Sequence, residues 1–421
     1  MDKKTQLKQQ VIQTIEDEKD QLLELCSDLI QIYSENPPGD STEITNYIEN
    51  YLNDFDFPVE THEATDKMYN IVSSYGDEDA GKTLIYCGHT DVVPAGNLDK
   101  WDFNPNSGEI EDGYLLGRGA SDMKAGLGGL IFATTLMKKL DIPLAGQVLL
   151  AIAPDEETGS EYGVPWLLDN GLIAGDGCLI AEPSSEYNPT LGQKGSYVFE
   201  LTVYGEPGHG SLSPIIGHNA ISDMMLALEK VQSVYDIEID LPAETHELIE
   251  VTKKYMQEVE VEKEPFQEIL ERVSCNIGRI EGGTKSNVVP ESCSAVIDCR
   301  LPFGITREEL TDYITSELDS LDIDYELQMS NSQSEANFTS PNDPVCKAVV
   351  NNIEEVSGHE AYGVMQWASS DARHFRRHDI PVLQYGPAEL STIHGYNERV
   401  KVDQIIQATK VYAATIIDFL C

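Results

Sequence analysis

Thr83-Leu-Ile-Tyr-Cys-Gly-His-Thr-Asp-Val-Val-Pro94 is an apolar run that ends in two polar side chains, His89 and Asp91. Such a run is typical of a buried strand. Because side chains alternate along a strand, His89 and Asp91 should point to the same side. A neutral imidazole is a good ligand for zinc-like ions, and a neighbouring carboxylate can orient it. The alternative here is a His–Asp pair that is only hydrogen-bonded at the strand end.

Two later apolar runs also end in carboxylates. Gln147–Gly159 carries the adjacent Glu156 and Glu157, and Gly177–Ser184 carries Glu182. Apolar strands that alternate with helices predict an α/β domain with a mostly parallel sheet covered on both faces. Ligands bind beyond the carboxyl ends of such strands, where these side chains should gather with those of the first run. A solvated loop is the alternative for the adjacent glutamates, whose like charges otherwise need a positive partner.

A further carboxylate, Asp122, lies in the glycine-rich segment Leu116-Gly-Arg-Gly-Ala-Ser-Asp-Met-Lys-Ala-Gly126, which continues into a helical run over 127–140. Free backbone N–H groups and the helix dipole favour a carboxylate at this edge, so helix capping is one interpretation. The glycines permit close backbone approach, but they are not spaced as a GxGxxG motif or a P-loop. We therefore reject a nucleotide site.

The composition is that of a globular protein of 421 residues, for which length favours two domains. The formal net charge is -45, from 73 Asp and Glu against 28 Lys and Arg. This charge argues against nucleic acid or an anionic membrane as a partner, because both need a basic surface. A uniform acidic excess would suit a protein kept soluble at high salt. An ordinary acidic enzyme is the alternative.

Residues 1–10 lack the apolar region of a secretory signal, and no apolar run of the sequence reaches membrane-spanning length. The eight cysteines form no CxxC pair, and several, including Cys87 and Cys178, lie in apolar runs. We interpret them as reduced thiols of a cytoplasmic protein.

The charge at the strand ends indicates how many ions they would hold. One histidine and several carboxylates are too negative for a single divalent ion, whereas two ions bridged by a shared carboxylate would neutralise them. The segments GHTDVVP, GRGASDMKAG, APDEETGS, LIAEPS and TIHGYNERV occur in this order over nearly the whole chain. They resemble the acetylornithine deacetylase and succinyl-diaminopimelate desuccinylase family of dinuclear zinc hydrolases. That family also includes aminoacylases and glutamate-type carboxypeptidases.

The resemblance implies a role for each polar residue at the strand ends. Asp91 would orient His89, and Glu156 would be the general base, because its neighbour is occupied as a ligand. His394 taken alone would be an ordinary surface histidine, and only its place in the motif makes it a candidate. The implied metal ligands are Asp122, which bridges two ions, His89 and Glu182 on one ion, and Glu157 and His394 on the other.

From about Lys194 the pattern changes to half-exposed strands and helices. The order strand-helix-strand-strand-helix-strand predicts a split βαβ, ferredoxin-like α+β sandwich. The family resemblance implies that this domain is inserted into the catalytic one as a lid and dimerisation domain. The catalytic domain, with a phosphorylase/hydrolase-like sheet, would then comprise 1–193 and 331–421, and the lid 194–330. The charged segment 236–272 is longer than a minimal connection, and we assign it no role. The expected lid strands are 197–204, 275–280, 294–299 and 325–329, and the helices are 219–235 and 307–321.

Within the lid, His209 in Gly205-Glu-Pro-Gly-His-Gly-Ser211 resembles the family histidine that polarises the substrate carbonyl, usually in the partner subunit's site. A simple turn residue is the alternative. Asn287 and Arg300 lie where family members contact the substrate. The guanidinium fork suits a carboxylate, although Arg300 could equally be a salt-bridged surface residue. Arg373 would also face the substrate.

Together these observations predict a cytoplasmic metal-dependent amidohydrolase that removes an acetyl or succinyl group from an N-acyl amino acid. The resemblance implies two divalent ions per subunit, zinc or else cobalt, and a homodimer through the lid. A dipeptidase or carboxypeptidase acting on a short peptide is the alternative within the enzyme class. A non-enzymatic scaffold on the same fold is the alternative outside it.

Overall fold

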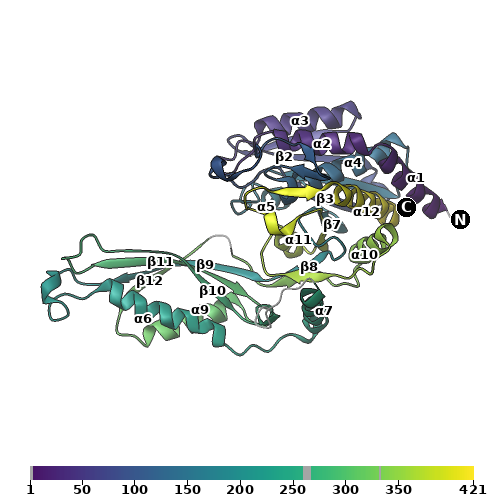
Figure 1. Ribbon diagram of the computed structural model, residues 1–421. Helices are drawn as coiled ribbons and strands as arrows, with labels where there is room; N and C mark the ends of the chain where they lie inside the picture. The colour runs from purple at the N-terminus through teal and green to yellow at the C-terminus, as the bar shows by residue number, and fades with distance from the viewer. Residues whose placement is uncertain (1–2, 259–266, 331–332) are drawn as a thin grey trace. The chain divides into compact units, whose positions relative to one another are not determined.

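The computed structural model describes residues 3–258, 267–330 and 333–421, and the chain divides into two compact units (Figure 1). The first unit comprises Met1–Leu191, Phe338–Val364 and Ser370–Cys421. The second comprises Gly192–Asn337 and Met365–Ser369. In chain order, most of the second unit is therefore inserted between two parts of the first.

The first unit is built on a mixed sheet, whose described strands follow the order β1-β2-β6-β3-β7-β15-β8-β13, with β14 beside β8. The strands β6, β3, β7 and β15 are parallel, whereas β1, β2 and β8 each run antiparallel to a neighbour. This arrangement confirms the predicted α/β class with a mostly parallel centre. The bounds are β1 (Val59–Thr65), β2 (Met68–Gly76), β3 (Lys82–His89), β6 (Gly146–Ala153), β7 (Gly177–Ile180), β8 (Thr190–Gln193), β13 (Asn337–Phe338), β14 (Val364–Gln366) and β15 (Val382–Gln384).

The central strands are buried on both faces. Every residue of β6 is buried, and in β3 only Lys82 is exposed, which explains why both read as continuous apolar runs. The chain passes from β3 through α4 (Ala125–Lys139) to β6, and then through α5 (Val164–Asp169) back past β3 to β7. These two crossovers run in opposite directions along the sheet. Since parallel crossovers are right-handed, α4 and α5 lie on opposite faces.

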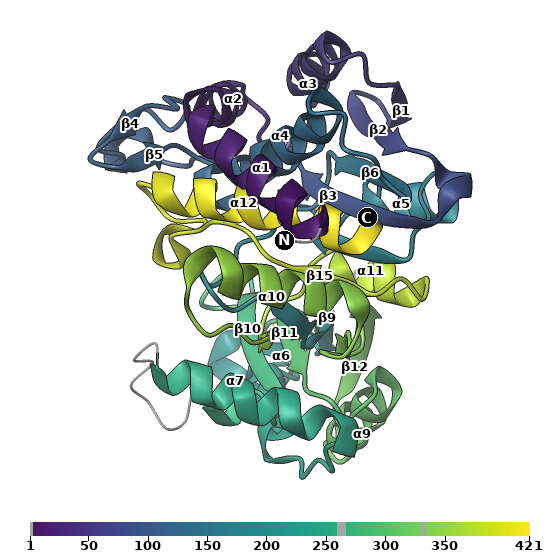
Figure 2. The same cartoon turned by 90° about the vertical axis from the view of Figure 1, so that its right-hand side faces the viewer.

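A layer of packed helices covers the sheet on the side of α4. α2 (Lys19–Gln31) and α12 (Val402–Leu420) pack against α4, and α1 and α10 pack against α12 (Figure 2). Gly126 lets α4 approach the segment after β7, because a Cβ there would lie 2.4 Å from the carbonyl oxygen of Ala181. The other helices of this unit are α1 (Lys3–Asp17), α3 (Thr42–Asp54), α10 (Pro344–Ser357) and α11 (Ala372–Arg377).

The second unit is a four-stranded antiparallel sheet in the order β10-β11-β9-β12, with two helices packed on one face. Along β9 the side chains of Tyr197, Phe199, Leu201 and Val203 are buried, while those between them are partly or fully exposed. The chain order β9-α6-β10-β11-α9-β12 confirms the predicted α+β sandwich. The bounds are β9 (Gly195–Tyr204), α6 (Ala220–Gln232), α7 (His246–Glu258), β10 (Ser274–Gly282), β11 (Ser292–Leu301), α9 (Arg307–Asp319) and β12 (Asp324–Met329).

Two elements and one strand end differ from what the sequence pattern indicates. α1 was not anticipated, because only Val11 and Ile15 among its apolar residues are buried, and it depends on packing against α12. β1 was not anticipated either, since none of its residues is fully buried and it pairs only at the sheet edge. β3 ends at His89, so Asp91 lies beyond the strand and not on its alternating face.

A small sheet of β4 (Ile110–Glu111), β5 (Tyr114–Leu116) and β16 (Arg399–Lys401) joins two distant segments of the first unit. All eight cysteines are free thiols. Among the described residues, none of the helices has both the length and the apolar character needed to cross a bilayer.

Candidate metal centre

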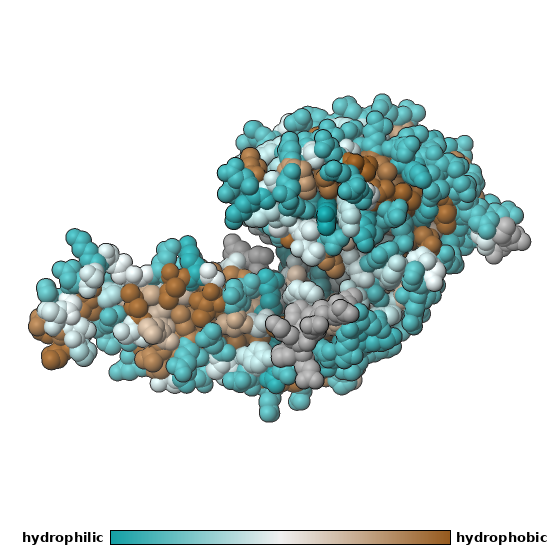
Figure 3. All heavy atoms as spheres, in the orientation of Figure 1, coloured by the Kyte–Doolittle hydropathy of each residue, from teal (hydrophilic) through white to brown (hydrophobic). Residues whose placement is uncertain are grey.

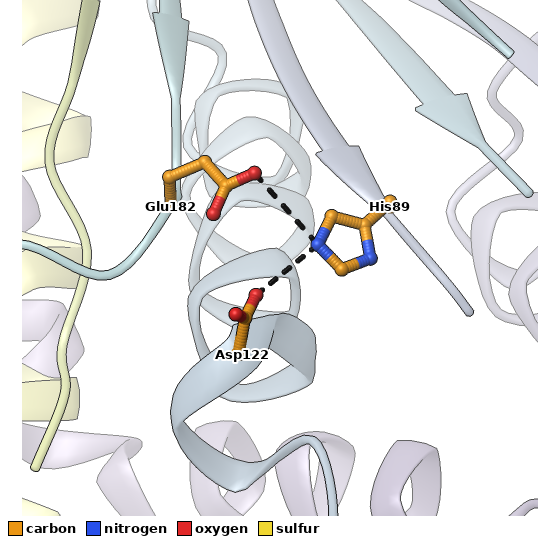
Figure 4. A group of neighbouring side chains, drawn as sticks. All are labelled: His89, Asp122 and Glu182. Atoms are coloured by element: carbon orange, nitrogen blue, oxygen red, sulfur yellow. Dashed lines mark hydrogen bonds and ion pairs between the residues drawn. The ribbon is translucent and has the colours of Figure 1, made fainter. Parts of the chain in front are cut away.

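His89 lies at the end of β3 with its side chain only 2% exposed. Its Nε2 is 3.2 Å from Asp122 Oδ1 and 3.8 Å from Glu182 Oε1 (Figure 4). Its Nδ1 is 2.9 Å from the backbone oxygen of Asp91 and 3.4 Å from the Asp91 carboxylate. An Nδ1–H donated to that backbone oxygen leaves Nε2 as the free ligand atom, facing the carboxylates.

A second histidine faces the same aspartate from the other side. His394 Nε2 is 3.3 Å from Asp122 Oδ2 and 3.2 Å from Glu157 Oε2. The two carboxylate oxygens of Asp122 thus face different histidines. Two groups of possible ligand atoms result. One atom each from His89, Asp122 and Glu182 lie within 4.8 Å of one another, and so do one atom each from Asp122, Glu157 and His394. The structure therefore brings together all five residues that the resemblance implies as ligands.

Asp122 owes its position to the turn before α4. It has extended backbone angles (φ -125°, ψ 95°), and α4 has no side-chain cap at its N-terminus. Its carboxylate contacts the two histidines, so the capping interpretation does not describe it.

The electrostatics of this cluster call for added positive charge. Burial raises the pKa of Glu182 well above its usual value, and the charge of Asp122 raises it further. Burial would also raise the pKa of Asp122, but hydrogen bonds with His394 and His89 lower it. Glu157 Oε1 is buried and has no hydrogen-bond partner among the described residues. Two imidazoles and three carboxylates, one of them with an orphaned oxygen, fit two divalent cations that share Asp122.

Asp91 holds the loop after β6 as well as contacting His89. Its Oδ1 accepts the backbone N–H of Glu156 and its Oδ2 that of Glu157, each at 3.1 Å. Its Oδ2 also accepts from Nδ2 of Asn36 at 3.0 Å, and the same Nδ2 lies 3.0 Å from Asp155 Oδ1. Sequence reasoning missed Asn36, because a single asparagine before two prolines carries no spacing signal.

Glu156 lies beside the cluster and belongs to neither group of candidate ligands. Burial raises the pKa of Glu156 well above its usual value, and the charge of Glu182 raises it further. A carboxyl that stays out of a cation site yet adjoins it has the position that a proton-accepting group needs.

The remaining candidates lie elsewhere in the two units. His209 is exposed on a loop of the second unit, where its Nδ1 is 2.8 Å from Ser211 Oγ. The backbone oxygen of Asn287 accepts the N–H of Gly210 at 2.9 Å, which places Asn287 beside His209. Arg300 forms a two-point ion pair with Asp298, with both N–O distances 2.9 Å.

Arg373 is on α11 in the first unit and is 8% exposed. In the part of the chain that the structure describes, its guanidinium forms no hydrogen bond or ion pair. Its charge acts on the buried Asp371, whose pKa burial raises and Arg373 lowers. A buried guanidinium without a direct hydrogen bond among the described residues favours an anionic ligand, because leaving such a group unsatisfied is costly.

The fold and the ligand set agree with the comparison to known families. The sequence pattern of peptidase family M20/M25/M40 matches residues 85–418, most of the chain. The chain belongs to this family. This M20 chain is 28% identical to the succinyl-diaminopimelate desuccinylase of Roseobacter denitrificans, over 83% of its own length and 86% of that protein. The predicted relationship to the desuccinylases is thereby confirmed.

Solved structures of M20 enzymes share the fold over nearly the whole chain. Human carnosine dipeptidase 1 superposes with a TM-score of 0.78 at 20% identity and covers 98% of both chains. An M20 metallo-carboxypeptidase, Sso-CP2 from Sulfolobus solfataricus, superposes with a TM-score of 0.78 at 20% identity, over 94% of this chain and 98% of that one. These superpositions show the fold, and membership of the M20 family shows that the protein is a hydrolase.

Proposed function

We propose that this M20 hydrolase is a metal-dependent deacylase that removes a succinyl or acetyl group from an N-acyl amino acid. The observation that carries the proposal is Asp122, whose two oxygens face two separate histidine and carboxylate groups, with Glu156 unused beside them. The similarity to desuccinylases supports the acyl amino acid as substrate. All eight cysteines are free thiols, which supports a cytoplasmic location.

In this proposal two divalent ions, zinc first and cobalt second, are held by the five clustered residues. Asp122 would be shared by both ions, His89 and Glu182 would hold one, and Glu157 and His394 would hold the other. When bound, the ions would polarise the substrate carbonyl and lower the pKa of the attacking water. Imidazole and carboxylate donors suit zinc, and three protein ligands per ion is the number found in catalytic zinc sites.

Residues of the chain transfer the proton of the attacking water and stabilise the negative charge on the carbonyl oxygen. Glu156 accepts a proton from the attacking water and passes it to the leaving amine. Asp91 holds Glu156 in place through the backbone N–H that it accepts. His209 donates to the carbonyl oxygen as negative charge develops on it.

Arg373 is the first choice for the substrate carboxylate, since it is buried and its guanidinium forms no direct hydrogen bond or ion pair among the described residues. Arg300 would have to share its fork with Asp298 or release it. Asn287 would contact the substrate from its position beside His209.

The lid, 194–330, would also pair two subunits. Apolar side chains lie on the surface of the second unit near α6 (Figure 3), and its exposed large residues include Met225, Leu226 and Ile215. Among the strands that the structure describes, β10 and β12 are at the edges of the sheet of this unit, and each pairs on one side only. These features support a homodimer formed through the lid.

The test compares the metal-loaded protein on N-succinyl-diaminopimelate, N-acetylornithine, other N-acyl amino acids and dipeptides. We expect kcat/KM to be highest for an N-acyl amino acid, to vanish in a chelator and to return with zinc or cobalt. Preference for dipeptides would instead establish the dipeptidase alternative. A metal-loaded protein that hydrolyses none of them would indicate a scaffold.

A further inference from the structure

Arg118 and Glu398 form an ion pair inside the first unit, between Arg118 Nη1 and Glu398 Oε2. Their side chains are 3% and 0% exposed. Both residues lie within motifs that supply metal ligands, yet neither belongs to a group of candidate ligands. A buried ion pair of this kind contributes little net stability, because desolvation offsets the attraction. Its geometry is therefore the more informative feature.

Glu398 fixes the backbone at Asp122. Its Oε1 accepts the N–H of Ser121 at 3.0 Å and the N–H of Asp122 at 3.1 Å. The backbone oxygen of Glu398 also accepts the N–H of Gly117 at 3.0 Å. The Glu398 segment and the Asp122 turn are thus joined by side chain and main chain.

Arg118 fixes the other segment, which carries His394. Its Nη2 donates to the backbone oxygen of Gly395 at 2.9 Å. Its guanidinium also lies over the ring of Trp101, 5.2 Å from the ring centre. His394 has a left-handed backbone conformation (φ 57°), which is unusual for a residue with a Cβ and needs such support.

We propose that the Arg118–Glu398 pair is a positioning clamp that sets the spacing between Asp122 and His394, and so the affinity of the ion held by Asp122, Glu157 and His394. The inference rests on the metal assignment of the proposed function. Arg118 contacts the His394 segment directly, through Gly395, but reaches the Asp122 backbone only through Glu398. Weakening its contacts should therefore affect the ion held by His394 more than the one at His89 and Glu182.

The test substitutes Arg118→Lys, which keeps the charge and loses the fork that reaches Glu398 and Gly395 together. Zinc is titrated into the metal-free protein by calorimetry, and bound metal is counted after dialysis. We expect two tight ions in the wild type. In the variant we expect one tight ion and a second weakened by about 10 to 100-fold, the usual effect of losing a residue that supports a ligand.

Lys8→Met is the control, because Lys8 forms a partly buried ion pair with Asp418, at 2.9 Å, within the α1, α10 and α12 layer. It should lower stability without changing either ion's affinity. If Arg118→Lys misfolds, the double variant Arg118→Met/Glu398→Gln removes both charges and should show the same selective loss. Unchanged zinc affinity in a folded Arg118 variant, or equal loss at both sites, would overturn the clamp. The readout is separate from turnover: a wild type that binds two ions without hydrolysing amides would refute the proposed function and leave the clamp testable.

Discussion

Glu156 and Glu157 are adjacent in sequence, yet the structure gives them different surroundings. Glu157 Oε2 is 3.2 Å from His394 Nε2, and its Oε1 is a buried oxygen without a hydrogen-bond partner among the described residues. Glu156 lies outside both candidate ligand groups. Consecutive residues beyond a strand point in different directions, so one can serve a cation while the other remains free for proton transfer.

The adjacent pair therefore contains its own control. Glu156→Gln should leave the bound metal nearly unchanged while kcat falls about 10² to 10⁴-fold, the usual effect of losing a general base. Glu157→Gln should lower the occupancy of one ion. Elemental analysis and steady-state kinetics on the same preparations measure both. Retained turnover in Glu156→Gln, or equal metal loss in the two variants, would show that the roles are wrongly divided.

At the scale of elements, a buried lysine links β9 to the segment 236–272, to which the sequence assigned no role. Lys194 is fully buried just before β9, and its Nζ donates to the backbone oxygens of Ile269 and Arg272, each at 2.7 Å. Burial lowers the pKa of Lys194 to about 7, and the charge of Arg300 lowers it further. The segment before β10 is therefore held by an ammonium group that is costly to keep charged.

The lowered pKa of Lys194 predicts a pH effect on stability. Between pH 7 and about 10.5 the unfolded chain binds this proton and the folded chain does not, so the free energy of unfolding should rise with pH by at most about 1.4 kcal/mol per unit. This contribution is lost as pH falls towards 7. Lys194→Met should remove it. In urea unfolding at pH 7, 8 and 9, the free energy of unfolding of the wild type should rise relative to that of the variant. Equal pH dependence in the two proteins would contradict the lowered pKa of Lys194.

At the scale of the whole molecule, the acidic excess is the largest feature. A net charge of -45 repels itself in dilute buffer, and added salt screens that repulsion. If the excess is an adaptation to high salt, the melting temperature should keep rising beyond 1 M salt, where the screening length is already about 3 Å. A protein that melts highest in dilute buffer would show that the charge has another cause.

The proposed dimer makes a second prediction at this scale. Under conditions that exchange subunits, inactive His209→Ala and Glu156→Gln variants are mixed. If His209 serves the partner's metals, a mixed dimer has one site with both lesions and one with neither. Activity should then return to roughly a quarter of wild type for random exchange of equal amounts. Demonstrated exchange without recovered turnover would show that His209 acts within its own chain, and a fully active monomer would remove the need for a dimer.

The elements of this fold were predictable where burial follows a local pattern. β3 and β6 were predictable because strands buried on both faces are continuous apolar runs. β9 was predictable because apolar and polar residues alternate along a half-buried strand. α1 and β1 were not predictable, because neither has a large apolar face and each depends on its neighbours, mainly α12 for α1 and β2 for β1. Local pattern carries no information about such a neighbour.

The sequence by itself determined the polar residues at the strand ends and the family they point to, since both follow from residue type and order. Only the tertiary structure decided that the two oxygens of Asp122 face different histidines, that Asp91 holds the backbone of Glu156, and that Arg300 is paired with Asp298. The physical reason is that the first two contacts join segments far apart in the chain. The third depends on a choice of side-chain rotamer. None of the three contacts produces a periodicity or a residue spacing in the sequence from which it could be predicted.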